Sequence, residues 1–431
     1  MKLNSDMQKL ASFQKSSMVL IAGFCMIVCL SVFLASCTED PPSGVDREKL
    51  FTLSFGRFED ELDLFNLDSN ETGPDSQIFM KDGMFYIANS GSQKILQLTS
   101  FGDLLSVYYD PDSNPVPSFA SASGANAEAA DASASPGATT TRKAVPYPLR
   151  HPTYLSVDSR KKLYVVDRVP EERYEYDSEA GVVLKEVVLA FAPDGRFTDY
   201  LGQEGPGGTP FPPVTGLFST AKNETVVVTK SQAGIKIFWF GPEGYLLYRI
   251  PVSFRNLPSP YDKGDSVYAT LEKIIPDQSS PRLYLKIDYY ATVIDTATGS
   301  NAGIAFDKSC LYPLDLETGS YSERIELPVY SGVDSTSLGT ETFNKPYELL
   351  GVSSSGWIFL ATPIDQGYML EILDSKSRRI LKRVLRVHSD ELAYNALTVS
   401  PEGIISALLA TNYEASVVWW RTDSLIGEIR R

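Results

Sequence analysis

A pattern of four short β-strands, repeated along most of the chain, constrains the fold more than any other feature of the sequence. In the first copy a strand that begins at Ile78 is followed by strands at Met84–Ala88, Lys94–Thr99 and Leu104–Tyr109. These runs are rich in β-branched and aromatic residues, and turn-forming clusters such as Asp82-Gly83 separate them. No long amphipathic helical period follows the N-terminal region. An all-β fold is therefore predicted.

The same order of strands recurs along the chain, with a spacing of 47 to 78 residues. The second strands of the six copies begin at Phe85, Leu163, Val226, Leu283, Trp357 and Ile404. The last copy is expected to end in a strand at Leu425–Ile429. Repeated four-stranded units are typical of propeller blades. The prediction is a single propeller, with six blades of four antiparallel strands, over residues 49–431.

A strand-like run at Leu50–Phe55 has no partner nearby in the sequence. An unpaired strand edge invites association with other chains, and closed rings avoid such edges. We expect this run to pair with the last blade and to close the ring without a covalent bond.

The first copy resembles the NHL repeat. Residues Phe85–Ile95 contain an aromatic residue followed by Ile-Ala-Asn, then a small polar loop and a basic residue before Ile, and Ser100–Leu104 is similar to the turn of that family. The second copy keeps this pattern at Leu163–Asp167 but inserts Arg168–Lys185 where a short loop would follow. The resemblance implies a propeller, a fold that hosts many functions.

The N-terminus has the features of an export signal. Three lysines precede an apolar run from Met18 to Leu34, and Leu34-Ala35-Ser36-Cys37 resembles the bacterial lipobox. The resemblance implies that residues 1–36 are removed and that Cys37 is acylated on its sulfur and its new amino group. Several acyl chains give a stable membrane anchor. The alternative is an uncleaved anchor helix.

Residues 37–48 are expected to be the lipidated cysteine and a polar tether rich in Pro and Gly. Ten extended residues reach roughly 33 Å, so the tether would hold the body close to a membrane surface. The predicted location is the cell membrane or the outer membrane, with the body in the periplasm or at the cell surface.

Residues 111–145 interrupt the strand pattern. Fourteen of the 24 residues from Ser118 to Thr141 are Ala or Ser, and charge pairs that could stabilise a helix are scarce. We expect a disordered loop between the first two blades. It is either an arm that binds a partner or a tolerated insertion.

Few residues suggest thiol or imidazole chemistry. Of the four cysteines, Cys25 and Cys29 lie in the leader and Cys37 carries the lipid, so Cys310 is expected to be a lone buried thiol. His151 and His388 are interpreted as loop or strand-end residues. Two histidines and one cysteine do not supply the ligand set of a zinc site.

Carboxylates at the ends of strands offer another possible site. Related six-bladed lactonases hold a divalent cation near the ring axis with Glu, Asp and Asn oxygens, and Asn89, Asp158, Asp167 and Asp288 lie at predicted strand ends. The alternative is that these side chains satisfy the backbone of turns.

Two aromatic runs, Phe238-Trp239-Phe240 and Val418-Trp419-Trp420, are expected in strands. Neighbouring residues of a strand face opposite sides. One aromatic ring of each run would therefore pack between blades. The next is either exposed, where it could bind a sugar or a protein, or is also explained by packing between blades.

The charge balance narrows the possible partners. The chain has 39 Lys and Arg against 54 Asp and Glu, a formal net charge of -15, which disfavours nucleic acid. Two functions remain. The favoured one is a membrane-tethered, non-enzymatic scaffold without a cofactor, which binds envelope proteins or cell-wall polymers. The alternative is a divalent-cation-dependent hydrolase, lactonase or lyase. No residue is assigned to catalysis or to a metal.

Overall fold

The structure is a computed structural model that describes residues 42–65, 76–120, 142–202, 208, 210–262, 267–295, 297–336 and 339–429. Contacts separate the chain into Met1–Ser43 and Gly44–Arg431, and the ring of strands belongs to the second unit. The predicted signal peptide, Cys37 and residues 121–141 of the predicted loop lie outside the described residues.

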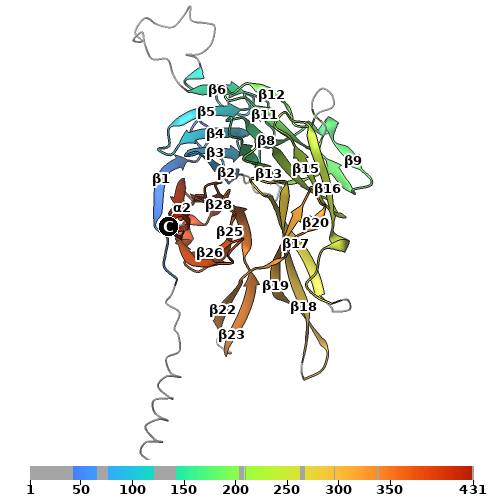
Figure 1. Cartoon of the computed structure of the whole chain (residues 1–431). Helices are drawn as coiled ribbons and strands as arrows, with labels where there is room; N and C mark the ends of the chain where they lie inside the picture. The colour runs from blue at the N-terminus through green and yellow to red at the C-terminus, as the bar shows by residue number, and fades with distance from the viewer. Residues whose placement is uncertain are drawn as a thin grey trace, which may run out of the picture. The chain divides into compact units, whose positions relative to one another are not determined.

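Six sheets surround a common centre and form the predicted six-bladed propeller (Figure 1). From the centre outward, blade one contains β2 (Ser76–Lys81), β3 (Met84–Asn89), β4 (Lys94–Thr99), β5 (Leu104–Tyr109) and β6 (Lys143–Pro146). Blade two contains β7 (Leu155–Val157), β8 (Leu163–Arg168), β11 (Glu186–Phe191) and β12 (Phe197–Tyr200). Blade three contains β13 (Val214–Ser219), β14 (Thr225–Lys230), β15 (Gly234–Phe240) and β16 (Leu246–Ser253).

The second half of the ring follows the same order. Blade four contains β17 (Val267–Pro276), β18 (Arg282–Ile294), β19 (Asn301–Asp315) and two short strands that pair with β19, namely β20 (Ser320–Tyr321) and β21 (Ile325–Glu326). Blade five contains β24 (Glu348–Val352), β25 (Trp357–Ile364), β26 (Gly367–Asp374) and β27 (Ile380–Arg386). Blade six contains β28 (Tyr394–Val399), β29 (Ile405–Ala410), β30 (Glu414–Trp420) and β1 (Arg47–Ser54).

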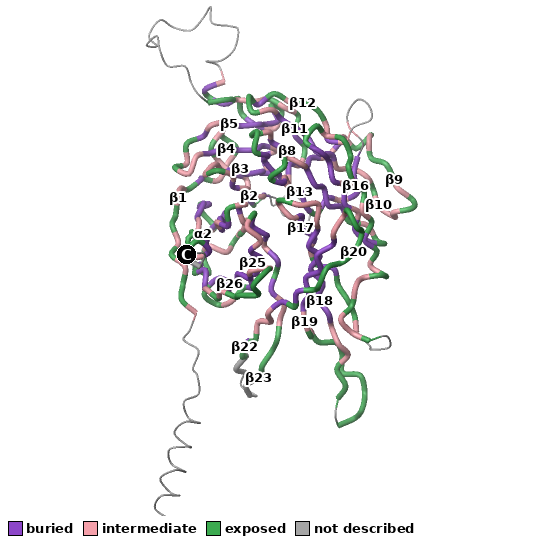
Figure 2. Tube along the Cα trace, in the orientation of Figure 1, coloured by how far each residue is buried: buried purple, intermediate pink, exposed green. Residues whose placement is uncertain are grey.

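Two hairpins lie outside this pattern. One joins β9 (Glu175–Asp177) to β10 (Val182–Leu184) within blade two's long insertion, and the other joins β22 (Val329–Thr336) to β23 (Gly339–Pro346). The β22–β23 hairpin and the extended ends of β18 and β19 project beyond the blades (Figure 1). Figure 2 shows that burial is concentrated in the middle strands, while the far ends of β18 and β19 are exposed.

The core is divided among the spaces between blades. Each of six clusters of buried apolar side chains belongs to one pair of neighbouring blades. Trp239 and Trp420 are fully buried in two of these clusters, as expected for one aromatic ring of each run. Phe240 is also buried and Phe238 is half-buried, so packing between blades accounts for all three rings of the first run. The neighbouring Trp419 is half-buried, and its indole N–H donates a hydrogen bond of 2.7 Å to Glu48. Its hydrogen bond thus links β30 to β1.

The predicted closure of the ring is confirmed. Strand β1 pairs antiparallel with β30, from Arg47 opposite Trp420 to Ser54 opposite Glu414. Leu53 is buried in the cluster between blades one and six, and Arg47 forms an ion pair with Glu391. The first strand of the ring thus completes the last blade. It begins two residues before the predicted start of the body at residue 49.

The predicted last strand, Leu425–Ile429, is wrong, because this segment belongs to helix α2 (Thr422–Ile429). The fourth position of blade six is already occupied by β1. Asp423 lies in the first turn, where a negative charge favours a helix, and Ile426 packs into the cluster between blades five and six.

The predicted limits of the loop at 111–145 are also corrected. Residues 143–146 form β6, which pairs parallel with β5 and adds a fifth strand to blade one. Phe119, within the predicted loop, is buried against the cluster between blades one and six. Ordered structure therefore extends into both ends of the predicted loop.

Leu53 provides a test of the closing strand. We expect Leu53→Ala to lower the free energy of unfolding by about 2–4 kcal/mol, because it empties a buried apolar site. Thr52→Ala, on the exposed face of the same strand, should change it by less than about 0.5 kcal/mol. Urea denaturation measures both values. Equal effects of the two substitutions would contradict a closure that depends on this burial.

Candidate functional site

The centre of the ring contains a cavity of about 170 Å³. All six inner strands contact their neighbours around the ring, and each blade contributes residues to the cavity wall. Its polar and charged lining residues are Gln77, Lys81, Tyr154, Ser156, Thr215, Ser219, Lys273, Gln278 and Thr398. The cavity is therefore shared among blades and requires a closed ring.

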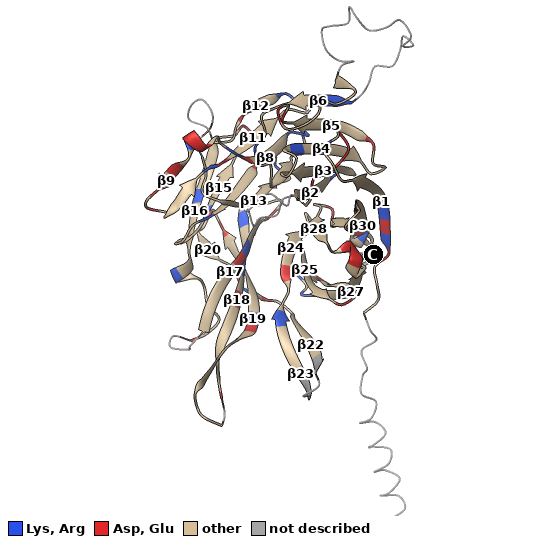
Figure 3. Cartoon of the chain, turned by 180° about the vertical axis from the view of Figure 1, so that it is seen from behind, with Lys and Arg blue, Asp and Glu red and all other residues tan. Residues whose placement is uncertain are grey.

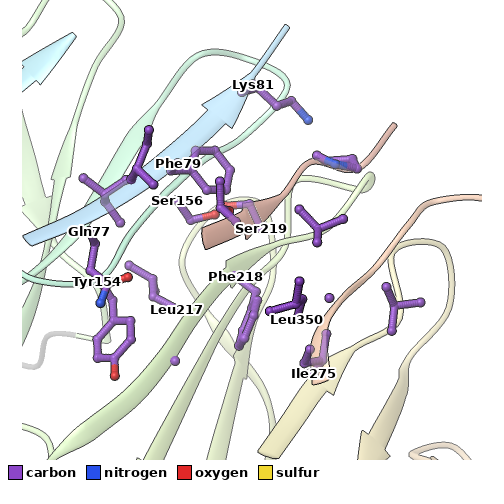
Figure 4. Close-up of a pocket in the computed structure, with 18 of the residues that line it drawn as sticks. Gln77, Phe79, Lys81, Tyr154, Ser156, Leu217, Phe218, Ser219, Ile275 and Leu350 are labelled. Atoms are coloured by element: carbon purple, nitrogen blue, oxygen red, sulfur yellow. The ribbon is translucent and has the colours of Figure 1, made fainter. Parts of the chain in front are cut away.

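Hydrogen bonding within the cavity crosses between blades. The Ser156 hydroxyl on β7 donates a hydrogen bond of 3.0 Å to the Ser219 hydroxyl on β13. Figure 4 shows these two side chains facing each other, with Phe79 beside them and Lys81 at one end of the view. The wall thus combines polar groups with aromatic rings.

Glycine at position 351 allows the inner strands of blades five and six to approach closely. A Cβ atom on Gly351 would lie 3.0 Å from the Cβ atom of Val399 on β28. That distance is shorter than ordinary van der Waals contact, so a larger residue would push β24 away from β28. This position helps to set the width of the cavity.

The charge of the cavity wall is positive. Among the described residues that line it, none is Asp, Glu, His or Cys, whereas Lys81 and Lys273 are present. Desolvation inside the ring lowers the pKa of Lys273, although Glu272 and Glu348 nearby act in the opposite direction. Burial raises the pKa of Tyr154, so its hydroxyl keeps its proton at neutral pH and can donate a hydrogen bond.

The four strand-end residues considered for a metal site are each held by local partners. Asn89 donates hydrogen bonds of 2.7 Å to the Asp63 carbonyl and the Ser76 hydroxyl. The buried Asp158 accepts a hydrogen bond of 2.9 Å from the Lys162 backbone N–H. Asn89 therefore fixes the backbone of the segment that precedes blade one, and Asp158 fixes a turn within blade two.

Asp288 and Asp167 are also engaged. Asp288 lies 2.8 Å from the buried Lys286 ammonium and accepts a hydrogen bond from Ser309. Asp167 accepts backbone N–H bonds of 3.1 Å from Arg150 and 2.6 Å from His151. The structure does not bring these carboxylates together. Over the described ranges, it contains no cluster of three His, Cys, Asp or Glu side chains suited to a metal ion.

The histidines and the lone cysteine occupy the expected surroundings. His151 precedes β7, and the exposed His388 follows β27 and caps a short 3₁₀ helix at Ser389–Glu391. Cys310 is fully buried in β19, and burial raises the pKa of its thiol. A protonated, enclosed thiol is a poor nucleophile.

Lys94, the basic residue of the NHL-like pattern, is buried and not part of the cavity wall. Its ammonium donates a hydrogen bond of 2.6 Å to the Phe58 carbonyl, in the segment that follows β1. Burial lowers its pKa to about 8, against the opposing effect of Glu61, Asp60 and Asp63. This residue connects blade one to the segment after the closing strand.

A second hollow of about 440 Å³ lies where the turns of blades four and five meet. Arg282, Lys376 and Arg378 contribute positive charge to its wall, and several serines contribute hydroxyl groups. Asp277, also in the wall, accepts hydrogen bonds from Ser279 and Ser280, which lower its pKa despite burial. The buried Nε of Arg282 has no hydrogen-bond partner among the described residues.

The cavity residues were not predicted from the sequence. Lys81, Ser156 and Lys273 lie on the inner strand of three different blades, far apart in the chain. The sequence signal that could have indicated the cavity is the presence of polar residues on the first strand of each blade, at positions that face the ring axis. Strand β13 was not predicted, because Gly216 interrupts its apolar pattern.

Comparison with models of known protein families finds no match, and comparison with curated protein sequences finds none either. The NHL resemblance therefore stays a prediction. The described part of the chain contains no helix with the length and hydrophobicity that a bilayer span requires.

Solved structures show propeller-like neighbours at low identity. A gluconolactonase from Xanthomonas campestris is 10% identical, with 88% of this chain and 97% of that chain covered and a TM-score of 0.37. The polysaccharide lyase Uly1 is 9% identical, with coverages of 87% and 99% and a TM-score of 0.42. The β-propeller domain of the Trilobed protease from Pyrococcus furiosus is 6% identical over 79% of each chain, with a TM-score of 0.33. Similarity at this level does not extend to ligand or reaction.

Asp167 makes the stability of the fold depend on pH. Burial raises the pKa of this carboxyl from 3.8 to about 6, against its backbone hydrogen bonds. The folded state therefore holds the proton more tightly than the unfolded chain. Protonation of Asp167 therefore adds up to roughly 3 kcal/mol to the free energy of unfolding. This stabilisation is fully present below about pH 4 and is lost as the pH rises through 6.

We expect Asp167→Asn to remove this part of the pH dependence of unfolding between pH 4 and 6. The control is Asp199→Asn, an exposed carboxyl in the same blade, which should leave the slope unchanged. Urea unfolding at a series of pH values measures both. An unchanged slope in Asp167→Asn would contradict the assignment.

Proposed function

We propose that this protein is a lipid-anchored, non-enzymatic binding scaffold of the bacterial cell envelope, which holds its partner at the central cavity of the propeller. The lipobox-like sequence at Leu34–Cys37 supports the anchor. The observation that carries the binding role is the cavity wall, where hydroxyl and amide groups and two lysines from separate blades surround one space.

The chemistry of this wall favours a particular ligand class. Ser156, Ser219 and Gln77 offer neutral hydrogen-bonding groups, while Lys81 and Lys273 favour negative charge. Hydroxyl-rich segments that bear carboxylate or phosphate groups match this combination. Anionic cell-wall polymers have such segments, so we propose them as the ligand of the cavity.

The anchor is tested by the Cys37→Ser variant of the full chain. We expect the wild-type protein to fractionate with membranes and to yield an acylated N-terminal peptide that begins at residue 37, as measured by mass spectrometry. The variant should lose this acylated peptide. A wild-type N-terminus that is unmodified or still carries the leader would contradict lipidation.

The binding role is tested with a purified anionic cell-wall polymer from the native envelope. We expect Lys273→Gln to weaken binding by at least about tenfold, because it removes a charge-assisted hydrogen bond inside a desolvated cavity. Lys222→Gln, an exposed lysine of blade three, is the matched control and should bind as the wild type does. Equal affinities of the two variants would contradict the cavity as the binding site.

The non-enzymatic part of the proposal has its own test. Elemental analysis of the purified protein should show no stoichiometric hard cation. A tightly bound equivalent of Ca²⁺ would instead favour the cation-dependent hydrolase, lactonase or lyase.

A further inference from the structure

The outer edge of blade five carries a run of positive charge in an acidic chain. Residues 375–388 contain six Lys or Arg and no Asp or Glu, although the formal net charge of the whole chain is -15. We call these six residues the basic edge: Lys376, Arg378, Arg379, Lys382, Arg383 and Arg386. They lie on β27 and on the turn that precedes it.

The charge of the basic edge is largely uncompensated. Lys382 lies 3.7 Å from Glu371, whereas the other five form no ion pair with any described residue. Arg378 and Arg383 donate hydrogen bonds to backbone carbonyls. These carbonyls accept hydrogen bonds from the guanidinium groups but do not neutralise their positive charge. Five of the six residues are exposed, and Arg383 is half-buried.

The chain enters the ring at this edge. Gly44 forms a parallel bridge with Val384, and the Val45 N–H donates a hydrogen bond of 3.0 Å to the Val384 carbonyl. The side chain of Arg386 lies beside Gly44. The chain then continues as β1, on the neighbouring outer edge (Figure 3). Gly44, the first residue of the unit that contains the ring, therefore lies beside the middle of the basic edge.

The distance to the predicted lipid is short. Six residues lie between Cys37 and Gly44, and the seven residue steps that join them span at most about 25 Å when fully extended. If Cys37 is anchored, Gly44 stays within this distance of the membrane. This distance is about three Debye lengths at physiological salt. A tether that is not fully extended would bring the basic edge within one Debye length of the membrane surface.

The polar hollow between blades four and five adjoins the basic edge, and its wall carries three cationic side chains against two carboxylates, Asp277 and Glu323. Lys376 and Arg378 form part of its wall, and Arg282 lies within it with an unpartnered, buried Nε. A phosphate group that approaches the basic edge would find further donors there.

We propose that the basic edge is a contact surface for the anionic lipid headgroups of the membrane that holds the protein. This inference rests on the lipid anchor of the proposed function and adds an orientation to it. Each Lys or Arg close to an anionic surface strengthens the association by about fivefold, and salt screens the effect. The propeller would then rest with blade five towards the membrane.

The test uses the full-length lipidated protein in vesicles, with a fluorophore on Ser377→Cys in the basic edge. Vesicles consist of phosphatidylcholine alone or with about a third phosphatidylglycerol, and both contain a headgroup-attached quencher. We expect quenching to be at least threefold stronger in the anionic vesicles and to fall to the neutral level in about 0.5 M salt.

Two matched charge variants locate the effect. The triple variant Lys376→Gln, Arg379→Gln, Arg386→Gln should abolish the difference between vesicles. A control with the same change in charge in blade three, Lys222→Gln, Lys230→Gln, Arg255→Gln, should keep it. Equal quenching in neutral and anionic vesicles, or equal loss in both triple variants, would overturn the proposal.

Failure of the anchor gives a different result. An unlipidated protein would not float with neutral vesicles, which refutes the anchor. The two triple variants can then still be compared by flotation with anionic vesicles. If only the variant in the basic edge fails to float, the basic edge is supported as a headgroup-binding surface.

Discussion

The pairing of β1 with β30 is the interaction on which the rest of the structure depends. A blade is a sheet with two apolar faces, and each face needs a neighbouring blade to bury it. The six clusters between blades satisfy this requirement only when blade six is complete and packs against blade one. Because β1 comes from the other end of the chain, the ring closes by hydrogen bonds and apolar contact, here through residues such as Leu53.

Closure also explains which parts of the fold the sequence could predict. The strands of blade one agree with the prediction to within a few residues, because local turns such as Asp82-Gly83 mark their limits. The last strand was predicted wrongly because its position was already taken by a segment about 370 residues earlier in the chain. Strand β6 was missed because its pairing with β5 is parallel and depends on a long connection.

The candidate site was less predictable than the fold for the same reason. The strand-end carboxylates could be identified from local patterns, and their roles proved local: Asp158 and Asp167 hold nearby backbone. The cavity combines positions from Gln77 to Pro401, which no local pattern connects. Only the ring geometry brings Ser156 within hydrogen-bonding distance of Ser219, 63 residues later. The spacing of residues in the sequence therefore cannot identify a binding site at the ring axis.

The distribution of charge makes the protein's electrostatic effect on a partner depend on the distance between them. A net charge of -15 describes the protein as seen from a distance, and it supports the argument against nucleic acid on that scale. Within a Debye length of roughly 8 Å, however, a partner responds to the nearest charges. At that range the basic edge presents Arg379 and Arg386, and the cavity presents Lys81 and Lys273. An anionic surface or polymer would therefore be repelled by most of the protein and attracted at these two places. In the proposed arrangement, a short tether would overcome the long-range repulsion by confining the protein near a membrane, and the local charges would then select its orientation.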